Sequence, residues 1–99
     1  MEGEKMLESR VENKLKKSVE AKGGKCLKFV SPGMRGVPDR ICLFPGGKII
    51  FVETKAPAGK PEPLQKKRHD ELRALGFDVR VVNTLEEAKE VVPNEVHST

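Results

Sequence analysis

Two short apolar runs separated by a turn constrain the fold of this chain more than any other feature. The runs are residues 41–44 and 49–52, and Pro45-Gly46-Gly47 lies between them. Apolar and β-branched runs of this length, joined by proline and glycine, predict two antiparallel strands connected by a tight loop. We therefore expect a hydrophobic β-hairpin over residues 41–52.

The register of this hairpin decides how the acids at its base are arranged. Asp39 comes just before the first strand, and Glu53 ends the second. If the loop has three residues, 45–47, with a glycine in the left-handed conformation, Phe44 pairs with Lys48 and Asp39 falls opposite Glu53. A two- or four-residue loop would send Asp39 to the other face of the sheet. We infer the three-residue loop or an equivalent bulge.

The residues at the base of the hairpin suit metal-dependent phosphodiester cleavage. Alternation along the strand places Lys55 on the face of Glu53, while Thr54 points away. Mg²⁺ takes hard oxygen ligands, which Asp39, Glu53 and the Thr54 carbonyl could supply, and a nearby lysine can act on water or phosphate. The alternative is an ordinary hairpin with a solvent-exposed Glu53–Lys55 pair. Charges that directly follow an apolar strand favour a site, because their burial is costly unless they are paired or metal-bound.

Further motifs accompany this arrangement in a fixed order along the chain. They are Val11-Glu12 with Leu15, Gly23-Gly24, residues 27–33, residues 35–39, residues 51–57, Leu64-Gln65 and residues 75–79. This ordered set resembles the virus-type replication-repair nuclease (VRR-NUC) family of the PD-(D/E)XK nuclease superfamily. The resemblance covers nearly the whole chain. It implies a restriction-endonuclease-like α/β core, with a small mixed sheet flanked by helices.

The resemblance also implies roles for particular residues. Asp39, Glu53 and Lys55 would form the catalytic core, with Glu12 as a further acid beside the metal and Gln65 as a helix residue that reaches into the site. The implied activity is that of a Mg²⁺- or Mn²⁺-dependent endonuclease acting on DNA. A minimal domain of this family is expected to work as a homodimer with two sites, with branched DNA such as a Holliday junction as a candidate substrate.

The first 22 residues predict an amphipathic helix. Its apolar positions recur at helical spacing over about residues 4–22, and Gly23-Gly24 ends it. Glu8 and Glu12 lie one turn apart, and Glu12 borders the apolar stripe. Because Glu12 also stands four residues before Lys16, a surface ion pair is the alternative to a role in the site. Which of the two glutamates serves as the helical acid stays open.

The remaining elements complete the order α-β-β-β-α-β-α in one domain, residues 1–99, with its core at about 4–93. Before the hairpin we expect a strand at 25–30 and a glycine-proline loop at 31–38. After it we expect a proline-rich loop at 56–63, a helix from Leu64 to Leu75 and a strand at 77–82. A capping box at residues 84–87 then opens a short helix closed by Pro93, and residues 94–99 are expected to fray. Gln65 and His69 share a helical face. We expect Gln65 to point towards the sheet and His69 to be partly buried beside Leu72.

Composition limits the chain to one small core. With 99 residues, 36% hydrophobic content and no Trp or Tyr, such a core is marginal alone, which favours self-association. No apolar stretch is long enough for a membrane span, and no signal peptide is evident. Cys26 and Cys42 lack metal-ligand spacing, so buried thiols in a reducing cytoplasm are expected. The family name further suggests a virus- or phage-encoded protein.

Basic residues are concentrated around the proposed site. Residues 21–68 carry eleven basic and three acidic side chains, whereas residues 69–99 carry three and seven. The candidates for phosphate contact are Lys28, Arg35, Arg40, Lys48, Lys60, Lys66, Lys67 and Arg68. DNA is therefore the expected partner. Two alternatives are a basic nucleic-acid-binding module with inert carboxylates, and a nuclease subunit of a larger repair or replication complex. The second would show an exposed apolar face beyond what a homodimer buries, and the sequence indicates none.

Overall fold

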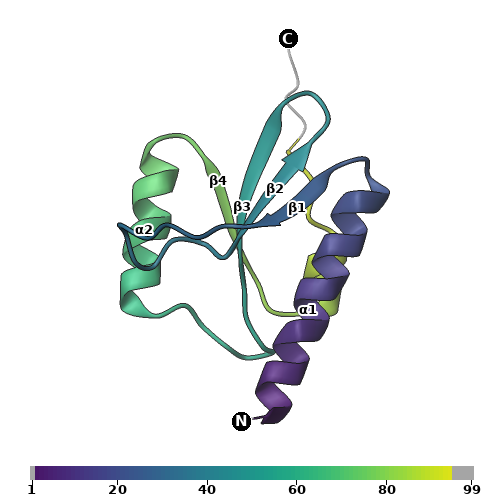
Figure 1. Cartoon of the computed structure of the whole chain (residues 1–99), viewed down its shortest axis with the longest axis horizontal. Coiled ribbons are helices and arrows are strands. Elements are labelled where there is room, and N and C mark those ends of the chain that lie inside the picture. Colours follow the sequence, from purple (N-terminus) through teal and green to yellow (C-terminus); the bar gives the residue numbers. More distant parts are fainter. Residues whose placement is uncertain (1, 95–99) are drawn as a thin grey trace.

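A computed structural model describes residues 2–94 of the chain (Figure 1). Its elements follow the order α-β-β-β-α-β-α that the sequence predicts. They are α1 (Glu2–Ala21), β1 (Lys25–Lys28), β2 (Arg40–Phe44), β3 (Lys48–Thr54), α2 (Pro63–Ala74), β4 (Asp78–Val82) and α3 (Leu85–Lys89). The end of the chain that was expected to fray falls, from residue 95 on, outside the described residues.

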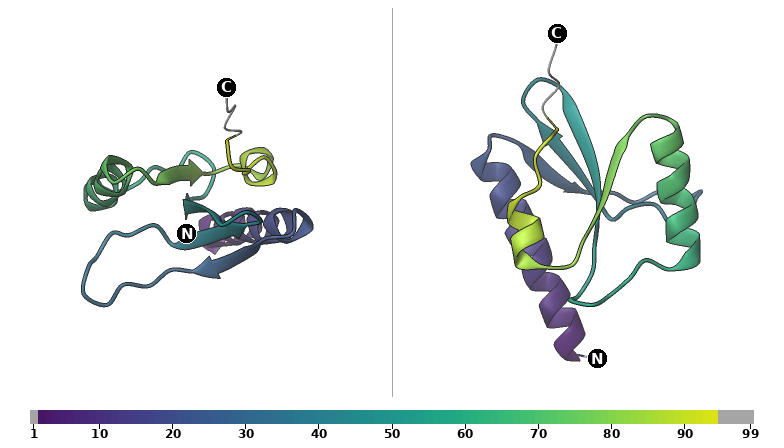
Figure 2. Two further views of the ribbon diagram at one scale, coloured as in Figure 1. Left: turned by 90° about the horizontal axis from the view of Figure 1, so that it is seen from above. Right: turned by 180° about the vertical axis from the view of Figure 1, so that it is seen from behind.

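The four strands form one mixed sheet in the order β1-β2-β3-β4. β1, β2 and β3 pair antiparallel, whereas β3 and β4 pair parallel. A parallel pair needs a crossover connection, and α2 supplies it. Seen from above, α2 lies on one side of the sheet, and α1 and α3 lie on the other (Figure 2). The predicted small mixed sheet flanked by helices is confirmed.

The hairpin of β2 and β3 has the predicted register. Phe44 pairs with Lys48 and Arg40 pairs with Val52, so the loop has three residues. Gly46 and Gly47 both have positive φ angles, 87° and 75°, a backbone conformation that residues with a Cβ rarely adopt. Continuing this register by one step brings Asp39 opposite Glu53. Asp39 itself lies just outside the ladder.

The core lies between α1 and the sheet. Of the apolar positions predicted at helical spacing on α1, Val11, Leu15 and Val19 are fully buried, whereas Leu7 is 41% exposed. Ile50 and Val52 of β3 are also fully buried. Ala88 and Val91, in and just after α3, complete the same cluster. Cys26 and Cys42, which are directly opposite each other on β1 and β2, are buried free thiols, as predicted. The alternation of β3 thus directs Ile50, Val52 and Thr54 towards α1, and Phe51 and Glu53 towards α2.

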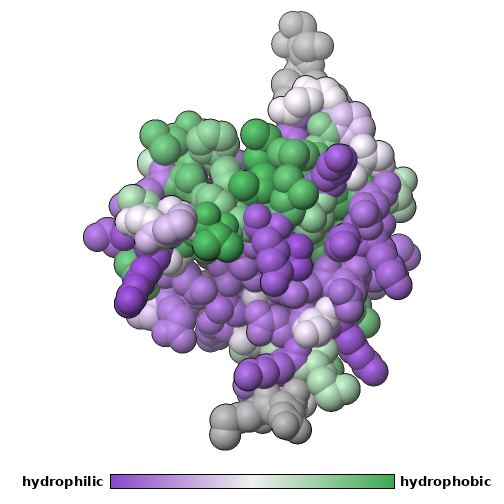
Figure 3. Space-filling model, in the orientation of Figure 1, coloured by the Kyte–Doolittle hydropathy of each residue, from purple (hydrophilic) through white to green (hydrophobic). Residues whose placement is uncertain are grey.

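The face of the sheet that carries α2 is only partly covered. Phe51 contacts Phe29 and Phe77, with ring centroids 5.7 and 5.4 Å apart. Leu27, Ile49 and Phe77 around it remain exposed. We call Leu27, Phe29, Ile49, Phe51 and Phe77 the apolar sheet face, and Figure 3 shows hydrophobic residues gathered in this region. The sequence did not indicate this exposed face.

Three local predictions need adjustment. β1 ends at Lys28, although the Phe29 amide still donates to the Asp39 carbonyl (2.9 Å). The capping box of α3 is half formed: Thr84 accepts from the Glu87 amide, but the Glu87 carboxylate accepts from the amide of Asn83 instead of that of Thr84. α3 itself ends at Lys89, four residues before the proline that was expected to close it.

None of the helices within residues 2–94 is long and apolar enough to cross a membrane.

Candidate active site

The acids predicted to act together meet at the end of β3. This strand delivers Glu53 towards α2 and Thr54 towards α1, and the chain then leaves the sheet through Lys55. Asp39 arrives at the same place from the loop before β2, and Glu12 arrives from α1. Because β3 stops here, side chains from both faces of the sheet approach one another around its end.

Thr54 holds Asp39 with two hydrogen bonds. Its amide donates to Asp39 Oδ1 (3.0 Å), and its hydroxyl donates to Asp39 Oδ2 (2.7 Å). The expectation that the Thr54 side chain points away from Asp39 is therefore wrong. The alternation rule applies within a ladder, but Asp39 precedes the first paired residue of β2, so its carboxylate turns across the end of β3 to the side of Thr54.

Two glutamates of α1 complete an acidic cluster with Asp39. One carboxylate oxygen from each of Glu8, Glu12 and Asp39 lies within 4.8 Å of the others. The structure thus brings both early glutamates to the site instead of choosing one. Glu12 lies 3.3 Å from the Thr54 hydroxyl. Its ion-pair partner is Arg40, whose guanidinium is 3.6 Å away, and not Lys16, the partner in the alternative surface ion pair.

Glu53 is buried beside this cluster, with only 3% of its surface exposed. Its Oε2 accepts a hydrogen bond from Gln65 Nε2 (3.2 Å) and lies 3.5 Å from Lys55 Nζ. The expectation that Gln65 points towards the sheet is confirmed. Gln65 also accepts from the amide of Glu62 (2.8 Å), which ties the start of α2 to the same side chain. Glu53 does not belong to the tight three-acid cluster around Asp39.

The other oxygen of Glu53 faces a buried histidine. His69 Nε2 lies 3.7 Å from Glu53 Oε1, too far for a hydrogen bond, and both atoms are buried without a partner among the described residues. His69 is 1% exposed, so it is more deeply buried than expected. Its position four residues after Gln65, on the same helical face, was the sequence signal that could have placed it in the site.

The environment of these acids favours their neutral forms. Burial, followed by the negative charge of Asp39, raises the pKa of Glu53 to about 7. Burial also raises the pKa of Asp39, against the two hydrogen bonds from Thr54, and raises the pKa of Glu8. Nearby positive charge would reverse these shifts. The atoms available to bind a metal here are carboxylate oxygens, which suit a hard divalent cation. One of them, the buried Glu53 Oε1, has no hydrogen-bond partner among the described residues.

The basic residues named as phosphate contacts divide into two groups. Lys28, Arg35, Lys48, Lys60, Lys66 and Lys67 are exposed. By contrast, the Arg40 side chain is only 12% exposed and faces Glu12, so it has an acidic partner within the protein and little surface left for phosphate. Arg68 is likewise engaged, with the Arg35 carbonyl (2.8 Å) and Glu71 (2.9 Å).

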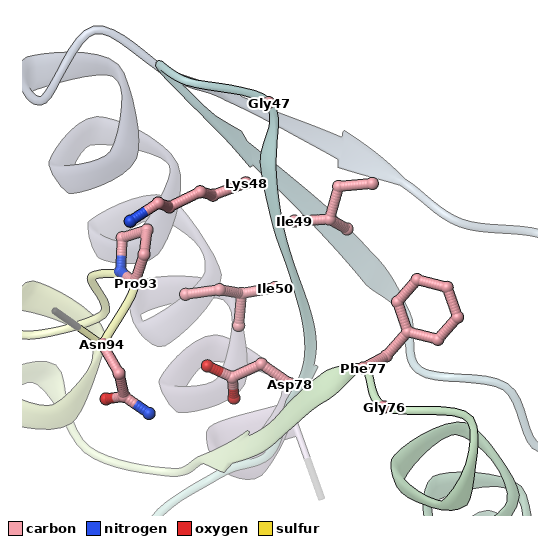
Figure 4. Close-up of a pocket in the computed structure, with 9 residues that line it drawn as sticks. All are labelled: Gly47, Lys48, Ile49, Ile50, Gly76, Phe77, Asp78, Pro93 and Asn94. Carbon is pink, nitrogen blue, oxygen red and sulfur yellow. The ribbon is translucent and has the colours of Figure 1, made fainter. Parts of the chain in front are cut away.

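An open cavity of about 350 Å³ adjoins the acids. Glu8 and Lys55 form part of its wall, together with Lys5, Gly59 and Lys60. It therefore joins one acid of the cluster to three lysines. A second cavity, of about 360 Å³, lies at the other end of β3, where Ile49, Ile50, Phe77 and Asp78 line it (Figure 4). This second cavity is away from Glu53 and Thr54, which end the strand.

Comparisons with known proteins agree with this geometry. No family model matches the chain. A curated protein named "Putative nuclease p44", from Acyrthosiphon pisum secondary endosymbiont phage 1, is 52% identical over 77 residues, which cover 78% of this chain and 83% of that protein. A solved structure described as "VRR_NUC domain" matches with a TM-score of 0.79 and 36% identity, over 84% of this chain and 90% of that chain.

The fold is therefore that of a nuclease with a restriction-endonuclease-like core. More specifically, the chain belongs to the VRR-NUC family.

Proposed function

We propose that this chain is a Mg²⁺- or Mn²⁺-dependent endonuclease that hydrolyses phosphodiester bonds in DNA. The observation that carries the proposal is the convergence of Asp39, Glu53 and the acids of α1 beside Lys55 at the end of β3. The pKa values of Glu8 and Asp39 in the cluster, and of Glu53 beside it, are all raised, so ionising these carboxyl groups together is costly unless a cation is bound. Membership in a nuclease family gives these acids a chemical purpose.

Each residue has a defined task in this proposal. Asp39, Glu53, Glu12 and the Thr54 carbonyl would hold the cation, which when bound supplies an acidified water and charge stabilisation at phosphate. Lys55, next to Glu53, would orient that water or the phosphate.

Two further groups of residues support the acids. Gln65 holds Glu53 by its 3.2 Å hydrogen bond and so fixes the direction of that carboxylate. Exposed lysines and arginine around the site would bind DNA phosphates without reading base sequence. These are Lys28, Arg35, Lys60, Lys66 and Lys67.

The proposal is tested by a cleavage assay of the purified protein on labelled linear, flapped, forked and four-way DNA, each with Mg²⁺, Mn²⁺ or EDTA. We expect cleavage only with a divalent ion, and none from Asp39→Asn or Lys55→Ala. Asp70→Asn is the matched control, because Asp70 is an exposed acid of α2 that forms an ion pair with Arg73. Cleavage by Asp39→Asn at the wild-type rate would refute the metal site. A basic binding module would instead bind DNA equally in Mg²⁺ and EDTA and never cut.

We also propose that the active particle is a homodimer and that it prefers branched DNA. The apolar sheet face supports association, because exposed apolar surface of this kind usually marks an interaction site. Two sites related by two-fold symmetry would suit paired nicks in a four-way junction. Light scattering with and without junction DNA tests the assembly. A monomer in both conditions would refute the paired-site arrangement, and a monomer that also fails to cut would favour the alternative of a subunit of a larger complex.

A further inference from the structure

Thr54 is the one fully buried hydroxyl at the end of β3. Its exposed fraction is 0%, and it follows Ile50 and Val52 on the face of the strand that packs against α1. Valine has nearly the same shape and would fill this position without burying a polar group. A hydroxyl in such a place is costly unless it makes hydrogen bonds, so the contacts of Thr54 indicate what it does.

The hydroxyl contacts acids of the site, and the amide of Thr54 donates to one of the same acids. Both Asp39 oxygens accept from Thr54, one from the amide (3.0 Å) and one from the hydroxyl (2.7 Å). The orientation of the Asp39 carboxylate is thereby set, and each oxygen keeps a second lone pair. Glu12 Oε1 lies 3.3 Å from the same hydroxyl oxygen. A hydroxyl has only one hydrogen, so the shorter contact marks Asp39 as its acceptor.

The Thr54 hydroxyl therefore lies between acids that come from two distant parts of the chain. Glu12 is carried by α1, and Asp39 by the loop before β2. Carboxylates this close, with oxygens within 4.8 Å, repel each other when both are charged, and the hydrogen bond from Thr54 holds Asp39 in place next to Glu12. Carboxylates that bind metals are commonly held in this way by hydrogen bonds from residues behind them.

We propose that Thr54 is a positioning residue, whose side-chain hydroxyl orients Asp39 beside Glu12 so that the two carboxylates can bind one divalent cation. The proposal rests on the metal-dependent nuclease function, and it assigns to the Thr54 side chain a task separate from that of its carbonyl. Every substitution at this position keeps the carbonyl, so the two tasks can be distinguished.

The test compares Thr54→Val, which loses the hydroxyl, with Thr54→Ser, which keeps it. Mn²⁺ affinity of the full chain is measured by calorimetry without DNA, and kcat and KM are measured with DNA. We expect Thr54→Val to bind Mn²⁺ about tenfold more weakly and to lose kcat without a matching change in KM, and Thr54→Ser to stay within about threefold of wild type. If Thr54→Val does not fold, Thr54→Ala takes its place.

Thr84→Val is the matched control, because the Thr84 hydroxyl caps α3 and touches no acid of the site. It should lower stability and leave Mn²⁺ affinity unchanged. Wild-type Mn²⁺ affinity in a folded Thr54→Val or Thr54→Ala variant would overturn the proposal, and so would a loss in Thr54→Ser as large as theirs. Failure of the nuclease function would look different, since the wild-type protein itself would then not bind Mn²⁺ or not cut DNA.

Discussion

Replacing Glu53 with Gln should stabilise the metal-free protein above neutral pH. The pKa of Glu53 is raised from 4.5 to about 7, first by burial and then by the charge of Asp39. At pH values between 4.5 and about 7, Glu53 keeps its proton in the folded protein but has released it in the unfolded chain. The free energy of unfolding therefore falls as pH rises through this window. A glutamine at this position cannot ionise, so the Glu53→Gln variant does not lose this stability as pH rises.

The size of the effect follows from the shift in pKa. The change from 4.5 to about 7 corresponds to about 3 kcal/mol once both states are ionised. Glutamine has nearly the same shape as glutamate, and its amide oxygen can still accept from Gln65. Glu53→Gln should therefore be about 2–3 kcal/mol more stable than wild type near pH ~8.5 in EDTA, and about equal to it near pH ~4.5. For a domain of this size, such a gain raises Tm by about 10–20 °C.

Thermal and urea unfolding followed by circular dichroism, in EDTA across this pH range, measure the difference. Glu71→Gln is the control, because Glu71 is an exposed acid paired with Arg68 and should change stability by less than ~0.5 kcal/mol. In Mg²⁺ the advantage of Glu53→Gln should shrink or reverse, since a bound cation stabilises the ionised acid. Equal stability of Glu53→Gln and wild type at high pH in EDTA would refute the reasoning.

Three other substitutions test separate parts of the site and the surface. Glu12→Gln should impair cleavage more than Glu8→Gln, because Glu12 also contacts the Thr54 hydroxyl; cleavage rates of the two variants check this. His69→Leu should lower kcat about tenfold with little change in KM, because its ring faces the buried glutamate of β3, and steady-state kinetics check this. Ile49→Lys should shift the protein towards monomer, as measured by light scattering, because Ile49 belongs to the apolar sheet face.

Each of these expectations has a result that contradicts it. A larger loss in Glu8→Gln would move the helical ligand to Glu8, and an unchanged kcat in His69→Leu would leave the histidine a packing role alone. Leu85→Lys is the control for Ile49→Lys, because Leu85 is a similarly exposed apolar residue on α3. If both lysine variants keep the wild-type mass, the dimer does not use the apolar sheet face.

Local patterns alone determined the elements and the register of the hairpin. The turn at residues 45–47 has two glycines that tolerate positive φ, and a three-residue loop of this kind places Asp39 opposite Glu53. Helical spacing likewise determined which side of α1 is buried. Short-range spacing placed Asp39 and Glu53 at the base of the hairpin with Lys55 beside them, whereas Glu12 and Gln65 were assigned to the site by the resemblance to the VRR-NUC family.

Only the tertiary structure decided which residues contact each acid of the site. Alternation predicted that Thr54 points away, but Asp39 lies outside the ladder and turns to it, so the pattern of period two does not apply there. The ion pair of Arg40 with Glu12 was likewise not predictable, because the two residues lie on different elements. Helical spacing could place His69 near the site, but not its distance from Glu53. Contacts between segments far apart in the chain depend on how helices pack across the end of β3, and no local spacing encodes that distance.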